Sequence, residues 1–246
     1  MKFSAIVTIG LVAGSLAMAQ QMKVKSRGEG TAVNAMLSAS DPDARIKAAE
    51  DLIAKYADTT FKAYALYIEA DAWQRKADTA KALFYAEESV NADATRFDAA
   101  LILTNLLSDQ TRSNDLDKED KFKRIQGYAE MALKGLETAQ KPNPALPDAE
   151  WAKFKNENRA DATQALAHLS VLRGKFDEGA KQYEEAMALN PDPFIMIRAG
   201  RAFLDMKKPE EAVKWIDRAL TSPKADDTVK RIGEADKARA VSQIKK

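Results

Sequence analysis

The stretch LAHLSVLRGKFDEGAKQYEEAMALNP, residues 166–191, decides the fold class of this chain. Apolar and small side chains recur every three or four residues on both sides of a polar break, RGKFDE, at residues 173–178. This period is typical of α-helices, because residues three and four apart share one helix face. Gly179, Tyr183 and Ala186 follow the break, and the stretch ends on a proline. It therefore predicts two antiparallel helices joined by a tight turn.

The second helix of this pair has a spacing, small-x3-apolar-x2-small, that returns along the chain. Small residues at such places let paired helices approach closely, and the larger residue fills the space between them. The four sets are Ala82, Ala86 and Ser89; Ile125, Ala129 and Ala132; Gly179, Tyr183 and Ala186; and Ala212, Ile216 and Ala219. Each set follows a segment with its own helical period, so the sequence predicts four successive helix pairs.

Other signals mark where helices begin and end. Asp41-Pro42 is a strong helix start, because aspartate caps free N–H groups and proline fits the first helical position. The polar range of about 109–120 predicts an exposed insertion, and the proline-rich range of about 141–147 predicts a break. Asp148 then restarts a long helix. The range 227–245 has a helical apolar period and predicts a terminal capping helix.

These features resemble the tetratricopeptide repeat (TPR), in which W-x2-L-G-x2-Y, A-x3-F and P recur over about 34 residues. The resemblance covers residues 41–246 and implies an all-α fold. That fold is a right-handed α-solenoid of antiparallel helix pairs, with a concave groove and a C-terminal capping helix. Within the family, the chain is most similar to exported bacterial TPR-containing proteins of unknown role. Glu69 departs from the pattern, because it occupies a position where the family usually has leucine.

The N-terminus predicts a signal peptide over residues 1–19. Lys2 precedes an apolar run at residues 3–16, and Ala17-Met18-Ala19 forms an A-x-A cleavage site. The run is shorter than the ~20 residues that span a bilayer as a helix. We therefore expect cleavage after Ala19, a mature chain without an integral membrane span, and a periplasmic or secreted location. Residues 20–40 are polar and contain glycines, which predicts a flexible lead-in.

Composition argues against several classes of function. The chain has no cysteine, so it has neither a disulfide framework nor a thiolate nucleophile. Its 38 basic and 37 acidic residues give no net field that would attract nucleic acid, and we expect no nucleic-acid partner. A single histidine, His168, cannot form a histidine metal cluster. The acidic run at residues 115–120 lacks the glycine that an EF-hand turn requires. We predict no catalytic site, no metal and no cofactor.

The resemblance implies that a groove is lined by five positions of each first helix. The candidate partner-binding residues are Phe194, Ile197, Arg198, Arg201, Leu204, His168, Tyr64, Tyr67, Arg75 and Asn105. Phe194, Ile197 and Arg201 are spaced i, i+3 and i+7, which predicts one stripe on one helix face. Chaperone-binding members hold a terminal carboxylate with a clamp of lysines, arginines and asparagines. This chain has Asn105 alone among the expected asparagines and no lysine set, so that function is not supported. A mixed apolar and polar groove fits an extended or helical peptide better. We interpret His168 as a solvated or ligand-contacting side chain.

We interpret the chain as a non-enzymatic protein–protein interaction scaffold or adaptor of the bacterial cell envelope. Its partner would be a protein or peptide segment bound in the concave groove. An alternative is a helical enzyme or carbohydrate-binding protein with a site of scattered aromatics and carboxylates, which convergent acids at ~5 to 10 Å would indicate. A third interpretation is a structural envelope component, which would carry a self-complementary patch at one end of the solenoid.

Overall fold

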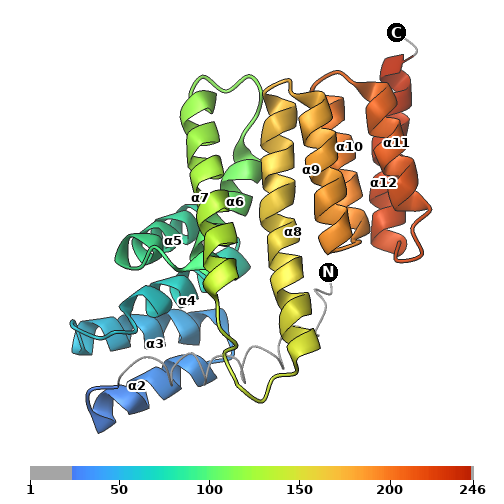
Figure 1. The fold of residues 1–246 in the computed structure, drawn as a ribbon. Coiled ribbons are helices and arrows are strands. Elements are labelled where there is room, and N and C mark those ends of the chain that lie inside the picture. Colours follow the sequence, from blue (N-terminus) through green and yellow to red (C-terminus); the bar gives the residue numbers. More distant parts are fainter. Residues whose placement is uncertain (1–23, 245–246) are drawn as a thin grey trace. The chain divides into compact units, whose positions relative to one another are not determined.

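A computed structural model describes residues 24–244 of the chain, and these residues form an all-α fold of eleven helices (Figure 1). The signal peptide that we predict over residues 1–19 lies outside the described residues. The helices are α2 (Arg27–Ser38), α3 (Pro42–Lys55), α4 (Lys62–Arg75), α5 (Thr79–Ala92), α6 (Phe97–Gln110), α7 (Lys118–Thr138), α8 (Asp148–Leu172), α9 (Phe176–Leu189), α10 (Pro193–Asp205), α11 (Pro209–Leu220) and α12 (Asp227–Ile244). Within residues 24–244, none of these helices combines the length and the apolar composition that crossing a bilayer requires.

The helices belong to two compact units. Among the described residues, unit 1 comprises 24–106 and 131–154, and unit 2 comprises 107–130 and 155–244. Helices α6, α7 and α8 contribute residues to both units. In unit 1, each helix from α2 to α5 packs against the next in sequence, and in unit 2 the same holds from α9 to α12. Helix α12 also packs against α10.

The stretch that decides the fold class forms the predicted helix pair in unit 2. Helix α8 ends at Leu172 and α9 begins at Phe176, so the turn is shorter than the predicted one. Gly174 in this turn has a φ of 79°, a backbone conformation that glycine adopts without a steric penalty. Gly179 marks the closest approach of the pair, because an added Cβ would lie 2.6 Å from Cγ2 of Val171. Tyr183 is fully buried between the helices.

The last helix pair, α10 and α11, shows the same use of small residues. An added Cβ at Gly200 would lie 2.6 Å from Cγ1 of Ile216 on α11. Ala212 and Ala219 of the predicted small–apolar spacing are fully buried. The small residues therefore lie where the helices contact each other. Helix α12 then covers this pair with Val229 and other residues of its buried side, as a capping helix does.

Two helix boundaries lie where the sequence signals lie, and the loop between α6 and α7 is shorter than expected. Oδ1 of Asp41 accepts a hydrogen bond from the backbone N–H of Ala44 at 2.9 Å, and the break at 141–147 separates α7 from α8. The insertion expected at 109–120 is a shorter loop at residues 111–117. The acidic residues that suggested a longer loop begin α7 instead, because acidic side chains are favourable at a helix N-terminus.

The lead-in expected at 20–40 differs from the structure, where α2 is a helix with a buried face. The Ser26 hydroxyl caps it by accepting from the Glu29 N–H at 3.1 Å. Glu29 is itself buried and accepts from the Thr59 hydroxyl at 2.7 Å, next to α4. Val33 and Met36 pack into the core of unit 1. Residues 27–38 therefore form the first packed helix of unit 1.

Candidate partner-binding site

One side of α10 presents an exposed stripe in unit 2. The helix begins where Oδ1 of Asp192 accepts from the Phe194 N–H at 2.9 Å, with a proline at the first helical position. Phe194 is 38% exposed, and Arg198, Arg201 and Asp205 are exposed as well. Their spacing of i, i+4, i+7 and i+11 places them along one helix face. We call these four residues the α10 stripe.

Two of the predicted contact residues on α10 are not on this surface. Ile197 and Leu204 are each only 2% exposed, so the prediction that they contact a partner is wrong. The reason is helix α12, which packs against α10. Cδ1 of Ile197 lies 3.2 Å from the position that a Cβ on Gly233 of α12 would occupy. Arg198 takes the place in the stripe that we expected for Ile197.

Helix α12 also determines which charges of the α10 stripe are already paired. Nε of Arg201 lies 2.6 Å from a carboxylate oxygen of Asp236, and the Arg239 guanidinium lies 3.4 Å from Asp205. Both pairs are partly exposed, so each stabilises the fold by ~1 kcal/mol or less. Arg201 is therefore part of an ion pair with α12, and it is a less direct probe of partner binding than the sequence suggested.

Arg198 differs from Arg201 because no described residue forms an ion pair with it. Burial is the main cause of the pKa shifts of Asp161 and His168 on α8, and the Arg198 charge opposes the rise in the Asp161 pKa and adds to the fall in the His168 pKa. An unpaired guanidinium remains able to donate hydrogen bonds to a carboxylate or a carbonyl group. Together with Phe194, one turn away, it offers a charged and an aromatic contact on the same helix face.

Polar groups of α8 belong to the same part of unit 2. Burial raises the pKa of Asp161 to about 6, and the Arg198 charge opposes that shift. The side-chain amide of Gln164 donates to Oδ1 of Asp161 at 2.9 Å, while its Oε1 atom is buried without a hydrogen-bond partner among the described residues. The Asp161 carboxyl therefore ionises at a pH only slightly below neutral.

His168 is less accessible than expected. Its Nδ1 lies 3.2 Å from the Ser108 hydroxyl oxygen, and burial lowers the pKa of the imidazole to about 4. The ring is therefore neutral at pH 7. The side chain is half-buried in unit 2, so it is less solvated than expected, and ligand contact by His168 stays a prediction.

The candidate residues of unit 1 form a separate cluster. Tyr64 and Tyr67 of α4 have ring centroids 5.8 Å apart, and the Arg96 guanidinium lies over them at 4.8 and 5.6 Å from the centroids. Nε of Arg96 donates to Oδ1 of Asp98 at 3.0 Å. Because Tyr64 is buried and Tyr67 is half-buried, the prediction that Tyr64 contacts a partner is wrong. This arginine–tyrosine cluster belongs to the packing of unit 1.

Two further candidates of unit 1 lie outside this cluster. Arg75 is exposed at the end of α4, and its Nε lies 3.0 Å from Asp71, which also pairs with Arg45 at 3.2 Å. Asn105 is half-buried on α6. Arg96 is not among the sequence-predicted candidates, because it precedes α6 in a turn and matches no position of the repeat pattern. Asp98, the second residue of α6, is the acidic neighbour that could have indicated an ion pair with Arg96.

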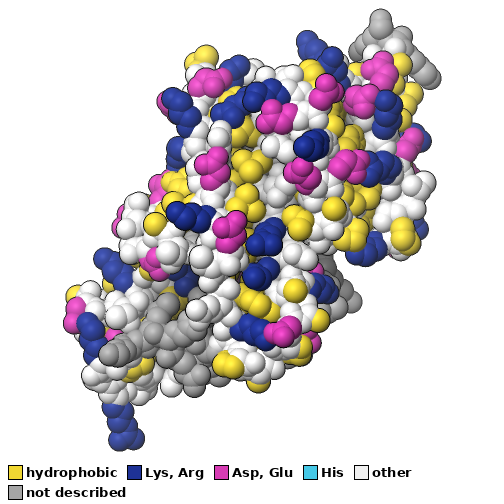
Figure 2. All heavy atoms as spheres, viewed as in Figure 1, with side chains coloured by type: hydrophobic (Ala, Val, Ile, Leu, Met, Phe, Trp, Pro, Cys, Tyr) yellow, Lys and Arg dark blue, Asp and Glu magenta, His cyan; other side chains and the backbone are white. Residues whose placement is uncertain are grey.

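The surface has a mixed charge. Figure 2 shows Lys and Arg side chains interspersed with Asp and Glu over the visible face, with hydrophobic side chains between them. This agrees with the nearly equal numbers of basic and acidic residues in the sequence. Within residues 24–244, no three His, Cys, Asp or Glu side chains are grouped so that they could hold a metal ion.

Comparisons with known proteins add a few distant likenesses. No family model matches the chain, and no curated protein sequence matches it. A thermophilic TPR protein of Thermus thermophilus is 20% identical with a TM-score of 0.46, over 79% of this chain and 90% of that one. A tetratricopeptide repeat protein of Parabacteroides merdae is 14% identical with a TM-score of 0.41, over 89% and 92%. An assembly chaperone of RpL4 (Acl4) is 13% identical with a TM-score of 0.34, over 83% and 92%.

Proposed function

We propose that this chain is a non-enzymatic protein–protein interaction scaffold that binds a peptide segment along the α10 stripe. The observation that supports it is Arg198, an exposed arginine without an ion-pair partner among the described residues, one turn from the exposed Phe194. Aromatic and arginine side chains are the types enriched among residues that contribute most to binding. The expected partner is a peptide with an acidic side chain for Arg198 and an apolar side chain for Phe194.

Replacing Arg198 by alanine should weaken binding without weakening the fold. Truncation of a central contact residue often costs ~2 kcal/mol, which corresponds to a ~30-fold rise in Kd. A peptide selected from a displayed library on the purified protein provides the ligand, and fluorescence polarisation measures its Kd. Arg198→Ala and Phe194→Ala should both raise that Kd, while the thermal midpoint of Arg198→Ala stays unchanged because Arg198 has no ion pair to lose.

Lys181→Ala is the matched control for this experiment. Lys181 is an exposed cation on α9 of the same unit, at most weakly paired with Glu185 at 3.8 Å. Its removal changes the net charge by the same amount and should leave the Kd unchanged. Equal effects of Arg198→Ala and Lys181→Ala would mean that only net charge matters. A selected peptide that binds Arg198→Ala as tightly as the unchanged protein would place the binding surface elsewhere.

The proposal includes a location in the bacterial cell envelope, outside the cytoplasm. It is supported by the charged, apolar and A-x-A order of residues 1–19 in the sequence. Protein recovered from the periplasm should have an intact mass that lacks Met1 to Ala19. As a control, Ala19→Leu should slow processing because signal cleavage needs small residues at this site. A full-length mass in the cytoplasmic fraction would contradict this part of the proposal.

A further inference from the structure

Glu69 of α4 is a buried acid without a compensating charge. Its side chain is 1% exposed, and one carboxyl oxygen, Oε2, has no hydrogen-bond partner among the described residues. The other oxygen accepts from the Tyr85 hydroxyl of α5. Within residues 24–244, no basic side chain forms an ion pair with Glu69. A carboxyl group this deeply buried normally has a cation beside it.

A second acid, Glu50 of α3, lies near the first. Burial is the main cause of the raised pKa of the Glu69 carboxyl, and the Glu50 charge raises it further. Glu50 is exposed, and it too has no ion-pair partner in the described part of the chain. Helix α4 packs against both α3 and α5 in unit 1. Glu50, Glu69 and Tyr85 therefore come together from three successive helices.

Aromatic rings on α5 lie next to these acids. Phe84 is 57% exposed, and its ring meets the half-buried Tyr85 ring edge-on, with the ring centroids 5.2 Å apart. Aromatic faces attract cations, and arginine in particular stacks on them. The acids and the rings therefore favour the same kind of ligand. We call Glu50, Glu69, Phe84 and Tyr85 the α3–α5 acidic site.

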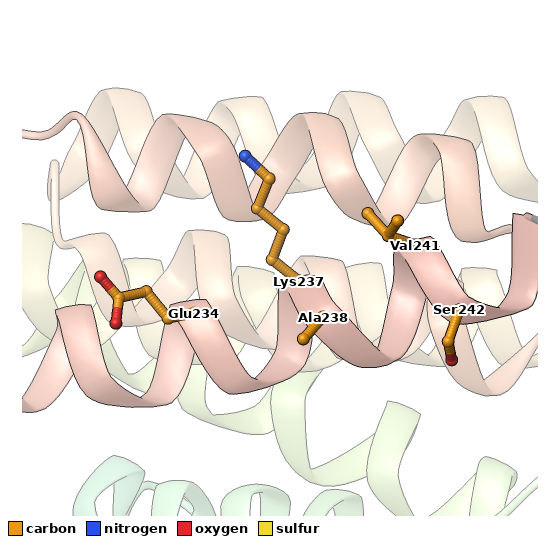
Figure 3. A pocket seen from close by; sticks show the side chains of 5 residues that line it. All are labelled: Glu234, Lys237, Ala238, Val241 and Ser242. Carbon is orange, nitrogen blue, oxygen red and sulfur yellow. The ribbon is translucent and has the colours of Figure 1, made fainter.

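The charges of this site differ from those of the pocket along α12 in unit 2. The residues that line that pocket are Glu234, Lys237, Ala238, Val241 and Ser242 (Figure 3). Lys237 is already paired with Asp217 at 2.6 Å, so an acidic ligand would have to break this pair. A cation at the α3–α5 acidic site breaks no ion pair, because neither acid has one among the described residues.

We propose that the α3–α5 acidic site binds an arginine side chain of a protein partner. The guanidinium has five N–H donors in one plane, so it can contact Glu50 and Glu69 together. Glu50 and Phe84 are exposed and meet it first. The Tyr85 hydroxyl then turns away from Glu69, and the guanidinium takes its place on the carboxyl group. This site lies in unit 1 and does not depend on the α10 stripe of unit 2.

Binding at this site should release a proton. Burial raises the pKa of Glu69 to about 8, so the carboxyl is protonated at pH 7 when nothing is bound. A guanidinium beside it favours the ionised form and lowers that pKa. Affinity should therefore rise with pH and level off above pH 8, with a Kd about 10-fold lower at pH 9 than at pH 7. Arginine stays charged over this whole range.

Titration with the peptide acetyl-Arg-Leu-amide tests the proposal on the purified chain. The arginine supplies the guanidinium, and the leucine supplies an apolar contact for Phe84. NMR signals of the Phe84 and Tyr85 rings report binding, and the Kd at pH 9 should be roughly 1 mM. The same peptide with citrulline in place of arginine keeps the shape and loses the charge. It should bind at least ~10-fold more weakly.

Replacing Glu69 by glutamine should weaken binding of the arginine peptide at least ~10-fold and abolish its pH dependence. Misfolding cannot explain such a loss, because the substitution removes a buried acid and should leave the thermal midpoint at pH 9 unchanged or higher. Glu88→Gln removes an exposed acid of α5 and is the matched control, which should leave the Kd unchanged.

Equal binding of the arginine and citrulline peptides would overturn the proposal. So would equal effects of Glu69→Gln and Glu88→Gln, since only net charge would then matter. Ring signals of Phe84 and Tyr85 that do not move with up to ~10 mM arginine peptide would overturn it as well. None of these results concerns Arg198, so each can be told apart from failure of the α10 stripe.

Discussion

Replacing Glu69 by glutamine should stabilise the protein above pH 8 and remove a large part of its pH dependence. Glu69 on α4 is 1% exposed, and its Oε2 has no hydrogen-bond partner among the described residues. Burial raises the pKa of this carboxyl from 4.5 to about 8, and the nearby Glu50 charge adds to the shift. A hydrogen bond with Tyr85 acts in the opposite direction. The folded protein thus favours a protonated Glu69 at neutral pH.

The sign of the effect follows from the raised pKa. Below pH 4.5 the carboxyl is protonated in both the folded and unfolded states, and its contribution to stability is fully present. This stability is lost as the pH rises towards about 8, because unfolding then releases the proton. One pKa unit corresponds to about 1.4 kcal/mol, so the loss amounts to at most about 5 kcal/mol. Glu69→Gln has no proton to lose.

Urea unfolding at pH 5 and at pH 9 measures this difference. Glu69→Gln should resemble the unchanged protein at pH 5 and should be several kcal/mol more stable at pH 9. Glu69→Leu, with the residue that the resemblance predicts here, should show the same weak pH dependence without any polar group. Hydrogen exchange of α4 amides assigns the change to unit 1. Parallel pH curves for all three proteins would contradict a buried, proton-binding Glu69.

Replacing Asp98 by alanine should cause a large loss of stability in unit 1. Arg96 is 4% exposed and lies over the rings of Tyr64 and Tyr67. Asp98 accepts hydrogen bonds from both Nε and a terminal nitrogen of this guanidinium. Removing one partner of a buried ion pair leaves the other charge uncompensated, which typically costs about 3 to 5 kcal/mol. We expect a loss of that size in urea unfolding.

Two variants separate this effect from ordinary loss of a charge. Asp58→Ala breaks the exposed pair with Lys25, in which the Asp58 side chain is 82% exposed, and should cost much less stability because water screens this pair. Replacing both members, Arg96→Met with Asp98→Ala, should recover much of the loss because no buried charge remains. If Asp98→Ala costs no more than Asp58→Ala, Arg96 must be solvated in solution.

Much of the fold can be predicted because its signals are local. The spacing of Gly179, Tyr183 and Ala186 lies within about two turns of one helix, and the packing of α8 against α9 uses those residues. Helix α2 could not be predicted in this way. Its glycines have a low helix propensity, so the segment does not look helical in the sequence. Its stabilising contact joins Glu29 to Thr59, thirty positions later in the sequence.

The candidate site is predictable only in part, for a related reason. The helical period places Phe194 and Arg198 on α10, and both are exposed in the structure. It cannot decide which side of α10 a later helix will cover. Ile197 and Leu204 are both buried, and Ile197 is covered by α12, a tertiary contact without a signature in the α10 sequence. The ion pair of Arg201 with Asp236 also joins α10 to α12, so the α10 sequence alone cannot predict it.

Gly200 limits which parts of α10 can diverge among descendants of this chain. Any side chain larger than hydrogen at this position would collide with Ile216, so substitutions here are selected against whatever the protein binds. Phe194 and Arg198 are exposed, so changes there disturb the packing of α10 on α11 far less. Mutational freedom on this helix therefore concentrates at these two positions of the α10 stripe. New partner preferences can arise there by single substitutions while the scaffold stays the same.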